Sequence, residues 1–513
     1  MTFLLSLSGF ELHTPLLYYF LATLTVFIVD KVLKSRKSTL PLPPGPKGLP
    51  IVGNLFDALV LDAEAPRAFW QWSRKYGSDI MFTSTPFQST LVLNSAMAAF
   101  DLLEKKSQIY SDRPHSTLDE LTGLDFNFGF MQYSLRWRIQ TATTRAFLRR
   151  VLQSPSSDDM VETVSLTFGS SIIKVVYGAD IKDTTHKYVQ SAHKHITIID
   201  ESHYLGSFWI DYFPFFKNIP AWIPGVRFNK FANESKPILE EAKRTPFEDT
   251  KHAAIEGSAE PSIAYSLLGK LQSLSNEISP DEYLEQEETV INTLGIAYAT
   301  GNDTTSSSAS TFLIAMTMNP RIQEKAQMEL DAYLGVSRLP EYSDYTSLPY
   351  IRAIALEVMR YNPVTPLGIP HRLMEDDEYN GFLIPKGTIV IANFWATLHN
   401  PEDYPDPDIF KPERFLKGGG QLDPSVRDPT TLAFGYGRRI CPGRHFNNQA
   451  MFLFIASTLQ VYNISPAKDE NGNFVDLTSC VEYTPGIVAT PRSLPCVLTP
   501  RSEAARRLII ESE

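Results

Sequence analysis

The spacing of apolar residues along the chain predicts a mainly helical protein. Apolar side chains recur at the three-to-four-residue interval that places them on one face of a helix. Five segments carry this pattern: 160–178, 280–318, 320–334, 351–361 and 447–460. The break between the second and third falls at Asn319-Pro320, because proline disfavours a helical residue before it. The pattern therefore predicts a helical core.

A minor β region is expected beside these helices. Residues 85–100, TPFQSTLVLNSAMAAF, are typical of a strand that passes into a helix. After Pro363, prolines, glycines and short β-rich runs such as GTIVIANF dominate until Asn447. No repeat, Gly/Ser linker or composition break divides the chain after residue 50, so 55–513 is predicted to be one large domain.

The N-terminal segment predicts a membrane anchor over residues 1–38. Residues 15–29, PLLYYFLATLTVFIV, carry no charge and precede Asp30 and four basic residues, Lys31, Lys34, Arg36 and Lys37. The run is short against the roughly 20 residues that span a bilayer, although Val32 and Leu33 extend it. The alternative is a cleaved signal peptide, but the charges follow the run and no small-x-small site comes after it.

The flanking charges also predict an orientation. By the positive-inside rule the basic cluster stays in the cytosol, so we expect a single-pass protein of the endoplasmic reticulum membrane with a cytosolic domain. Residues 39–54 follow as a hinge, with LPLPPGPKGLPIVGN at 40–54. Its prolines fix φ, so this segment should be stiff and should hold the domain at a set angle to the membrane. A generic spacer has a similar composition.

Composition narrows the class of partner. The chain has 513 residues, of which 43% are hydrophobic and 20% are charged, as in an ordinary globular protein. A net charge of -11 gives no long-range attraction for phosphate backbones, so nucleic acid is excluded as an expected partner. Three cysteines, Cys441, Cys480 and Cys496, are too few for a disulfide framework and fit a reducing compartment.

One cysteine stands in a distinctive loop. Residues 434–446 read FGYGRRICPGRHF, in the spacing F-x-x-G-x-R-x-C-x-G, with the fixed positions Phe434, Gly437, Arg439, Cys441 and Gly443. The glycines let the backbone turn tightly so that amide groups can point at the sulfur. This loop resembles the haem-binding loop of cytochromes P450. The resemblance implies haem b with its iron on the Cys441 thiolate, whose electron donation favours O–O cleavage. A buried free cysteine in a Gly-rich turn is the alternative.

Two further segments resemble structural parts of that family. Residues 357–360, EVMR, place Glu357 and Arg360 on one face of a helix, a spacing that is common on solvated helices. PERF follows at 412–415. The resemblance implies that Arg414 completes a buried ion-pair network with Glu357 and Arg360, which fixes the segment leading to the cysteine loop. Such a network is structural and not catalytic.

Residues 300–305, TGNDTT, resemble the family's (A/G)-G-x-(D/E)-T-T stretch, where the long helix crosses the haem. Hydroxyl and carboxylate side chains are weak helix formers, so a functional reason for them is reasonable. The resemblance implies that Thr304 hydrogen-bonds bound O2 and that Asp303 relays protons inward. Thr300 stands where the family has a small residue and adds bulk near the substrate. A kinked or capped helix with a Ser/Thr face is the alternative.

Haem propionates need cations or hydrogen-bond donors, and the resemblance offers four candidates from separate segments. They are Arg113 in YSDRP, Trp137 in RWR, His371 in IPHR, and Arg439. Each could equally be an ordinary surface residue.

Three segments, WIDYFPFFKNIPAWIPG, NFWATLHNPEDYPDP and AFGYGRRICPGRHF, most resemble those of fungal microsomal P450 monooxygenases of secondary and xenobiotic metabolism. The resemblance implies that O2 is used with two electrons from NADPH, delivered by a separate NADPH-cytochrome P450 reductase, since the chain has no flavin or nicotinamide motif. Arg438, Arg439 and Arg444 would offer that reductase a basic face. The substrate is expected to be lipophilic, a terpenoid, steroid or aromatic, because the candidate pocket residues are apolar. These residues are Phe126, Phe128, Phe130, the 208–224 segment, Val364, Leu367 and Ile369.

One departure from the family opens other interpretations. The family shows Y-G-x-x-W-R-x-x-R-R followed by a long helical stretch, whereas here YSLRWRIQTATTRAFLRRVLQ runs straight on, with Thr141 in place of an arginine. We therefore expect a shortened third-helix region after Arg138 and weaker haem retention, unless Arg138 or Arg145 substitutes. A haem-binding but inactive protein and a reductase-independent P450 that rearranges peroxides remain alternatives, and Asp303 with Thr304 argues against the second.

Overall fold

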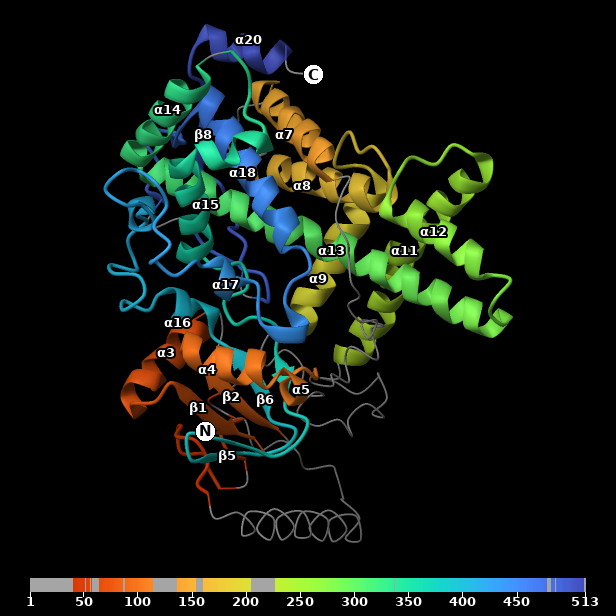
Figure 1. Cartoon of the computed structure of the whole chain (residues 1–513), viewed down its shortest axis with the longest axis vertical. Helices are drawn as coiled ribbons and strands as arrows, with labels where there is room; N and C mark the ends of the chain where they lie inside the picture. Colours follow the sequence, from red (N-terminus) through yellow and green to blue (C-terminus); the bar gives the residue numbers. More distant parts are fainter. Residues whose placement is uncertain are drawn as a thin grey trace, which may run out of the picture.

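The computed structural model describes residues 40–511 except for 51, 56, 58–63, 86–87, 114–135, 154–159, 204–226, 336, 478–480 and 485. In this part of the chain a large group of helices lies on one side of a smaller β region (Figure 1). The C-terminal helix α20 (Glu503–Glu511) lies at the top of the view, far from the sheet.

The long helix α13 (Pro280–Met318) runs through the helical part (Figure 1). Its start is fixed by a capping box, in which the Ser279 hydroxyl accepts from the Glu282 amide while the Glu282 side chain accepts from the Ser279 backbone. Pro280 at the first turn costs no hydrogen bond, because that turn's amides have no partner within the helix. The helix ends at Asn319, where Pro320 begins α14 (Pro320–Leu334).

Four helices meet at one buried aromatic side chain. Phe454 of α18 (Arg444–Val461) is fully buried, and its ring lies 4.7 Å from Phe147, 5.3 Å from Phe168 and 5.9 Å from Phe312. These three come from α7 (Arg136–Gln153), α8 (Met160–Tyr177) and α13. Tilted and edge-on ring contacts add to the stabilisation from apolar burial. The same core includes α15 (Pro349–Tyr361) and the strand pair β7 (Tyr462–Pro466) and β8 (Cys496–Pro500).

A second buried cluster joins α8 and the first half of α13 to three further helices. These are α9 (Lys187–His203), α11 (Arg227–Glu256) and α12 (Ile263–Leu274), of which α11 and α12 are drawn on the right of Figure 1 and α9 near its centre. The helical pattern of the sequence did not single out these three helices. α11 is 30 residues long and contains Pro237 and Pro246. Because proline inside a helix removes a backbone hydrogen bond, each of these residues favours a helix end when the sequence is considered alone.

The main sheet joins strands from opposite ends of the chain. Its order is β1 (Ile80–Ser84), β2 (Ser89–Leu93), β6 (Ile389–Ala392) and β3 (His371–Arg372). β2 pairs with β6 in parallel, and the other pairings are antiparallel. The hairpin β4 (Asp377–Tyr379) and β5 (Phe382–Ile384) lies nearby (Figure 1). The expected strand-to-helix passage over 85–100 is confirmed, as β2 leads into α4 (Ala96–Ala99).

The predicted hinge packs onto this sheet. The Pro44 carbonyl accepts from the Phe82 amide at 2.9 Å, and the Pro41 carbonyl accepts from the Leu383 amide at 2.9 Å. A Cβ on Gly45 would lie 1.9 Å from the Phe82 carbonyl oxygen, so only glycine permits this approach. Residues 1–38, the predicted anchor, lie outside the described residues. Among the helices in the described part of the chain, none has the length and apolar character needed to cross a bilayer.

The predicted helices are confirmed, with two boundaries corrected. α18 begins at Arg444 and not at Asn447, because Gly443 serves as its N-terminal cap position. α15 begins at Pro349 and not at 351, since proline suits the first position of a helix. The fold is thus mainly α with a minor β region, as expected.

Candidate functional site

The cysteine loop is closed by its own backbone and by a neighbouring helical turn. The Cys441 amide donates to the Phe434 carbonyl at 2.8 Å, which folds 434–441 into a compact loop. Gly435 and Gly437 have φ of 79° and 57°, a left-handed conformation that favours glycine. A Cβ on Gly437 would lie 2.5 Å from the Leu103 carbonyl oxygen of η1 (Phe100–Lys105), and the Gly437 amide donates to the Glu104 carboxylate.

The Cys441 sulfur lies at the start of α18. The amides of Gly443 and Arg444 hydrogen-bond it and lower its pKa, but burial has the larger effect and raises the pKa above the usual value. The thiol is therefore protonated in this structure at neutral pH, and a metal ion at the sulfur would displace the proton. Gly443 leaves the space beside the sulfur open, since a Cβ there would lie 3.6 Å from Sγ.

Three cationic or basic side chains from separate segments meet beside the loop. Nη1 of Arg113 donates to the carbonyls of Ile369 and Pro370 at 2.9 and 2.8 Å. Burial lowers the pKa of Arg113 to about 10, and the charge of Arg439 lowers it further in the same direction. Arg439 donates from Nε to the Ser111 carbonyl at 3.0 Å. Among the described residues neither guanidinium has a carboxylate partner.

His371 completes this group. Its Nδ1 donates to the Tyr110 carbonyl at 2.7 Å, because a carbonyl can only accept. Burial, with the charges of Arg113 and Arg439, lowers the pKa of His371 to about 4. The imidazole is thus neutral at pH 7, and its Nε2 can donate only if an anion beside it raises that pKa. The two positive guanidiniums of Arg113 and Arg439, together with the His371 imidazole, therefore form a site suited to binding carboxylates.

On α13, the TGNDTT segment keeps a continuous helix. The hydroxyls of Thr300 and Thr304 donate back to the carbonyls of Ile296 and Thr300 at 2.8 and 2.9 Å. Asp303 and Thr304 are partly exposed, whereas Asn302 is buried and donates from Nδ2 to Oδ1 of Asp303 at 2.8 Å. The hydroxyl of Thr304 is therefore a mobile donor that can exchange the helix carbonyl for a ligand.

Packing of α18 on α13 brings these two segments toward each other. Phe446, which follows Cys441 by five positions, lies in one buried cluster with Leu294 and Tyr298 of α13. Both α13 residues lie within three turns of helix before Thr304. The loop that carries the cysteine thus approaches the stretch of α13 that leads into TGNDTT.

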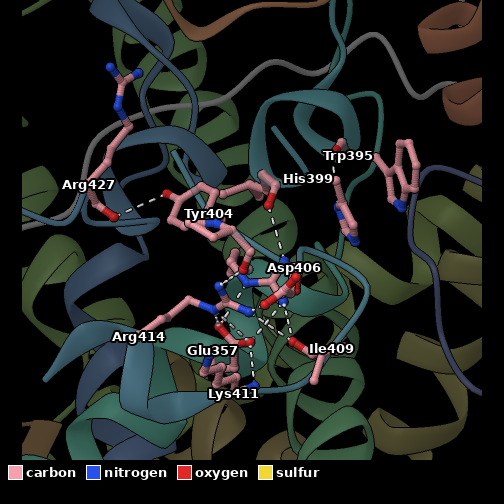
Figure 2. Close-up of polar contacts among 12 residues, drawn as sticks. Glu357, Trp395, His399, Tyr404, Asp406, Ile409, Lys411, Arg414 and Arg427 are labelled. Atoms are coloured by element: carbon pink, nitrogen blue, oxygen red, sulfur yellow. Dashed lines mark hydrogen bonds and ion pairs between the residues drawn. The ribbon is translucent and has the colours of Figure 1, made fainter. Parts of the chain in front are cut away.

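The predicted ion-pair network is confirmed and is shown in Figure 2. Glu357 and Arg360 of α15 are fully buried and bonded twice, Nε to Oε2 and Nη2 to Oε1, both at 2.8 Å. Nε of Arg414 lies 3.1 Å from each Glu357 oxygen. The Lys411 amide adds a further bond to Oε1 at 2.8 Å. One carboxylate therefore pairs with two guanidiniums and holds the meander before the cysteine loop.

The two arginines also tie down the backbone of that meander. Arg360 donates to the carbonyls of Leu398 and Ile409. Arg414 donates to those of Asp406 and Ile409 (Figure 2). Asp406 has φ of 54°, a conformation that is uncommon outside glycine, and Arg414 holds its carbonyl in place. The contacts of the network are thus with its own members and with the meander backbone, which is consistent with the structural role expected of it.

Several predicted residues are placed elsewhere or fall outside the described part. Trp137 lies in α7, but its side chain and that of Thr141 are not among those described, nor are Phe126, Phe128, Phe130, 208–224 and Cys480. Val364 and Leu367 are partly exposed, and Ile369 is 43% exposed. Cys496 is a buried strand residue whose pKa burial raises to about 12, an ordinary core position.

Of the three arginines predicted to form a basic face around the cysteine loop, Arg438 is exposed, Arg439 donates to the Ser111 carbonyl, and Arg444 donates from Nη1 to the Cys441 carbonyl at 3.1 Å. These bonds leave the guanidinium charges in place, and a reductase face there stays a prediction. Sequence reasoning also missed Glu104, whose carboxylate accepts from the Gly437 amide. It missed the carbonyls of Tyr110 and Ser111 because a backbone acceptor is present at every residue and gives no pattern in the sequence.

A comparison with family models decides the class of protein. The model described as "Cytochrome P450" matches residues 126–487, which is more than half of the chain. The chain belongs to the cytochrome P450 family. Members of this family carry a haem bound through a cysteine thiolate, use O2 and a redox partner, and act on small molecules. The chain is thus an oxidoreductase of the P450 monooxygenase family.

Curated fungal relatives resemble this P450 over nearly its whole length. A cytochrome P450 monooxygenase of Rhodocybe pseudopiperita is 36% identical over 98% of this chain and 97% of its own. Monooxygenase 208 of Postia placenta is 37% identical over 95% and 96%. The tryptamine 4-monooxygenase of Psilocybe cyanescens is 36% identical over 90% and 93%.

The geometry of this P450 fits the haem that the family carries. A flat group with two carboxylates and one free axial position on its metal needs a soft ligand, a cradle without side chains and nearby cations. Cys441 with its two amide donors, Gly443, and the pair Arg113 and Arg439 supply these on the described residues. His371 adds a donor once it is protonated.

Proposed function

We propose that this P450 inserts one oxygen atom of O2 into a lipophilic small molecule, with electrons from NADPH delivered by a separate NADPH-cytochrome P450 reductase. The observation that carries the proposal is the joint presence of the Cys441 loop and of Asp303 with Thr304 on α13. A peroxide-rearranging P450 needs neither proton donor. Terpenoids, steroids and aromatics are the proposed substrate classes, and the name of one relative, a tryptamine 4-monooxygenase, favours testing tryptamine as well.

In this proposal each residue has a distinct task. Cys441 binds the haem iron, and the haem supplies O2 activation when bound. Arg113, Arg439 and His371 hold the propionates, with Trp137 as a fourth donor, while Phe434 and Gly443 shape the loop. Thr304 exchanges its bond to the Thr300 carbonyl for one to O2, and Asp303 delivers the protons that the reaction consumes.

Replacement of Thr304 tests the proton-delivery step. Thr304→Ala removes a hydroxyl without opening a buried cavity, so we expect haem content to be unchanged while hydrogen peroxide formed per NADPH rises several-fold. The measurement uses purified protein with added reductase, first without substrate and then with progesterone, 7-ethoxycoumarin and tryptamine as probes. The control is Thr305→Val, since the Thr305 hydroxyl is buried and, within the described part of the chain, donates to the Gly301 carbonyl of its own helix. An unchanged peroxide ratio in Thr304→Ala would count against a role for this hydroxyl.

We further propose that the region after Arg138 is shortened and that haem retention is weaker as a result. Supporting this, YSLRWRIQTATTRAFLRRVLQ runs straight on where the family shows a long helical stretch, and Thr141 stands in place of an arginine. A lost charge-assisted contact to a propionate is worth roughly 1.5 to 3 kcal/mol, which weakens haem binding by about one to two powers of ten.

Haem titration tests this proposal. We expect a version with a family-length segment inserted after Arg138 to bind haem about 10- to 100-fold more tightly than the natural chain, measured by Soret absorbance. Activity only in the lengthened version would identify the natural chain as a haem-binding but inactive P450. A glycine-serine insert of equal length is the control for added chain, and equal affinity in all three proteins would exclude the idea.

We propose that residues 1–38 anchor the enzyme in the endoplasmic reticulum membrane as a single pass, with the catalytic domain in the cytosol. Removal of these residues should release the protein to the supernatant of a carbonate-washed membrane fraction without altering its haem spectrum. Replacement of Leu17 and Leu24 by arginine in the full chain is the matched control for the apolar run. Complete retention of the truncated protein on membranes would place the attachment elsewhere in the chain.

A further inference from the structure

α8 and α13 approach each other closely at the TGNDTT turn. A Cβ on Gly169 of α8 would lie 3.1 Å from Oδ1 of Asn302, and a Cβ on Gly301 would lie 2.8 Å from Cγ1 of Ile172. The two helices therefore meet through glycines on both sides. The side chain that fills this contact is Asn302, which is only 3% exposed.

The buried amide of Asn302 is held from three directions. Its Nδ2 donates to Oδ1 of Asp303 at 2.8 Å and to the Ser165 hydroxyl at 3.4 Å. Its Oδ1 lies 3.4 Å from the Ser306 hydroxyl, which donates mainly to the Asn302 backbone carbonyl at 2.8 Å. An ionised carboxylate can only accept, so the amide must turn its N–H groups toward Asp303. Loss of these hydrogen bonds would leave a buried amide unsatisfied and would raise the free energy of the folded state. The orientation of the Asn302 amide is therefore well determined.

We infer that Asn302 is a positioning residue, which holds the Asp303 carboxylate in the orientation used for proton delivery and ties it to α8. The inference rests on the proposed function, in which Asp303 passes a proton toward Thr304 and O2 and regains one from solvent water. Asn302 touches neither O2 nor substrate. Loss of its amide removes a 2.8 Å bond that helps to orient the carboxylate, so fewer encounters have the geometry for transfer.

Two substitutions of similar volume remove the donor. Asn302→Leu is apolar, and Asn302→Asp places a second carboxylate beside Asp303. In each we expect NADPH consumption, at saturating reductase and O2, to fall roughly 10-fold, the scale of one charge-assisted hydrogen bond. The solvent deuterium isotope effect on that rate should rise, which a packing defect would not cause. Thr305→Val is the matched control and should retain both the wild-type rate and the wild-type isotope effect.

A double-mutant cycle separates positioning from a general structural role. In an Asp303→Asn background, Asn302→Leu should cause no further loss of rate, because the group that it positions is gone. An additional 10-fold loss there would overturn the inference. If Asn302→Leu does not bind haem, as judged by the carbonyl spectrum, Asn302→Asp decides in its place.

The same cycle distinguishes the two levels of the proposal. A wild-type rate in Asp303→Asn alone would overturn the proton role of Asp303 and with it the proposed function of this turn. A slow Asp303→Asn with wild-type rates in both Asn302 variants would overturn the positioning role alone.

Discussion

Cys441→Ser is expected to abolish the red-shifted Soret band of the reduced carbonyl complex. A serine hydroxyl is far too weak an acid to replace a thiolate as an iron ligand, even where a metal ion displaces the proton. The amides of Gly443 and Arg444 that support the sulfur would remain, since they belong to the backbone at the start of α18. The measurement is the dithionite-reduced carbonyl difference spectrum, with total haem determined on the same sample.

Two other cysteines provide the controls. Cys496→Ser and Cys480→Ser should keep the band, although the first places a hydroxyl in the buried β7–β8 region and lowers stability to urea by about 1 to 3 kcal/mol. A band that persists in Cys441→Ser, or that disappears in Cys496→Ser while the protein stays folded, would assign the ligand elsewhere.

Glu357→Gln should be the most destabilising substitution outside the cysteine loop. Glutamine keeps the size of the side chain but removes the charge that balances Arg360 and Arg414, and Arg360 is fully buried. Removing one partner of a buried ion pair leaves an uncompensated charge and costs about 3 to 5 kcal/mol. We expect the urea midpoint to fall accordingly, and haem to be lost earlier in the titration, because the network holds the meander that leads to Cys441.

Glu413→Gln is the matched control, because Glu413 precedes Arg414 of the network in the short helix Pro412–Phe415. Its carboxylate pairs with Lys325 at 2.5 Å, but the two side chains are 34% and 57% exposed. An exposed pair of this kind is worth about 1 kcal/mol or less, so its urea midpoint should change little. Equal losses in the two variants would contradict the assignment of Glu357 as the centre of the network.

The local features of this protein follow from contiguous sequence. The helices at 160–178, 280–318 and 320–334 were predictable because apolar spacing acts within one element, as do the prolines that begin the second and third. The cysteine loop was predictable for the same reason, since its glycines, its arginine and its sulfur all lie within ten positions. α11 was missed, because its internal prolines favour helix ends in an isolated peptide and only packing against α9 and α13 outweighs them.

The sequence by itself determined that this chain is a thiolate-loop protein with a long helix carrying an acid and an alcohol. Only the tertiary structure decided which groups face one another. Arg113, His371 and Arg439 are held together by hydrogen bonds to the backbone carbonyls of residues 110, 111, 369 and 370. Every residue has such a carbonyl, so the sequence does not indicate which ones are used. Asn302 occupies a variable position of its motif, so the sequence gives no reason to single it out. The structure shows that its side chain bonds to Asp303 and lies in the space left by Gly169 of α8. The physical reason is that burial and partner choice depend on contacts between distant segments, which spacing along one element does not encode.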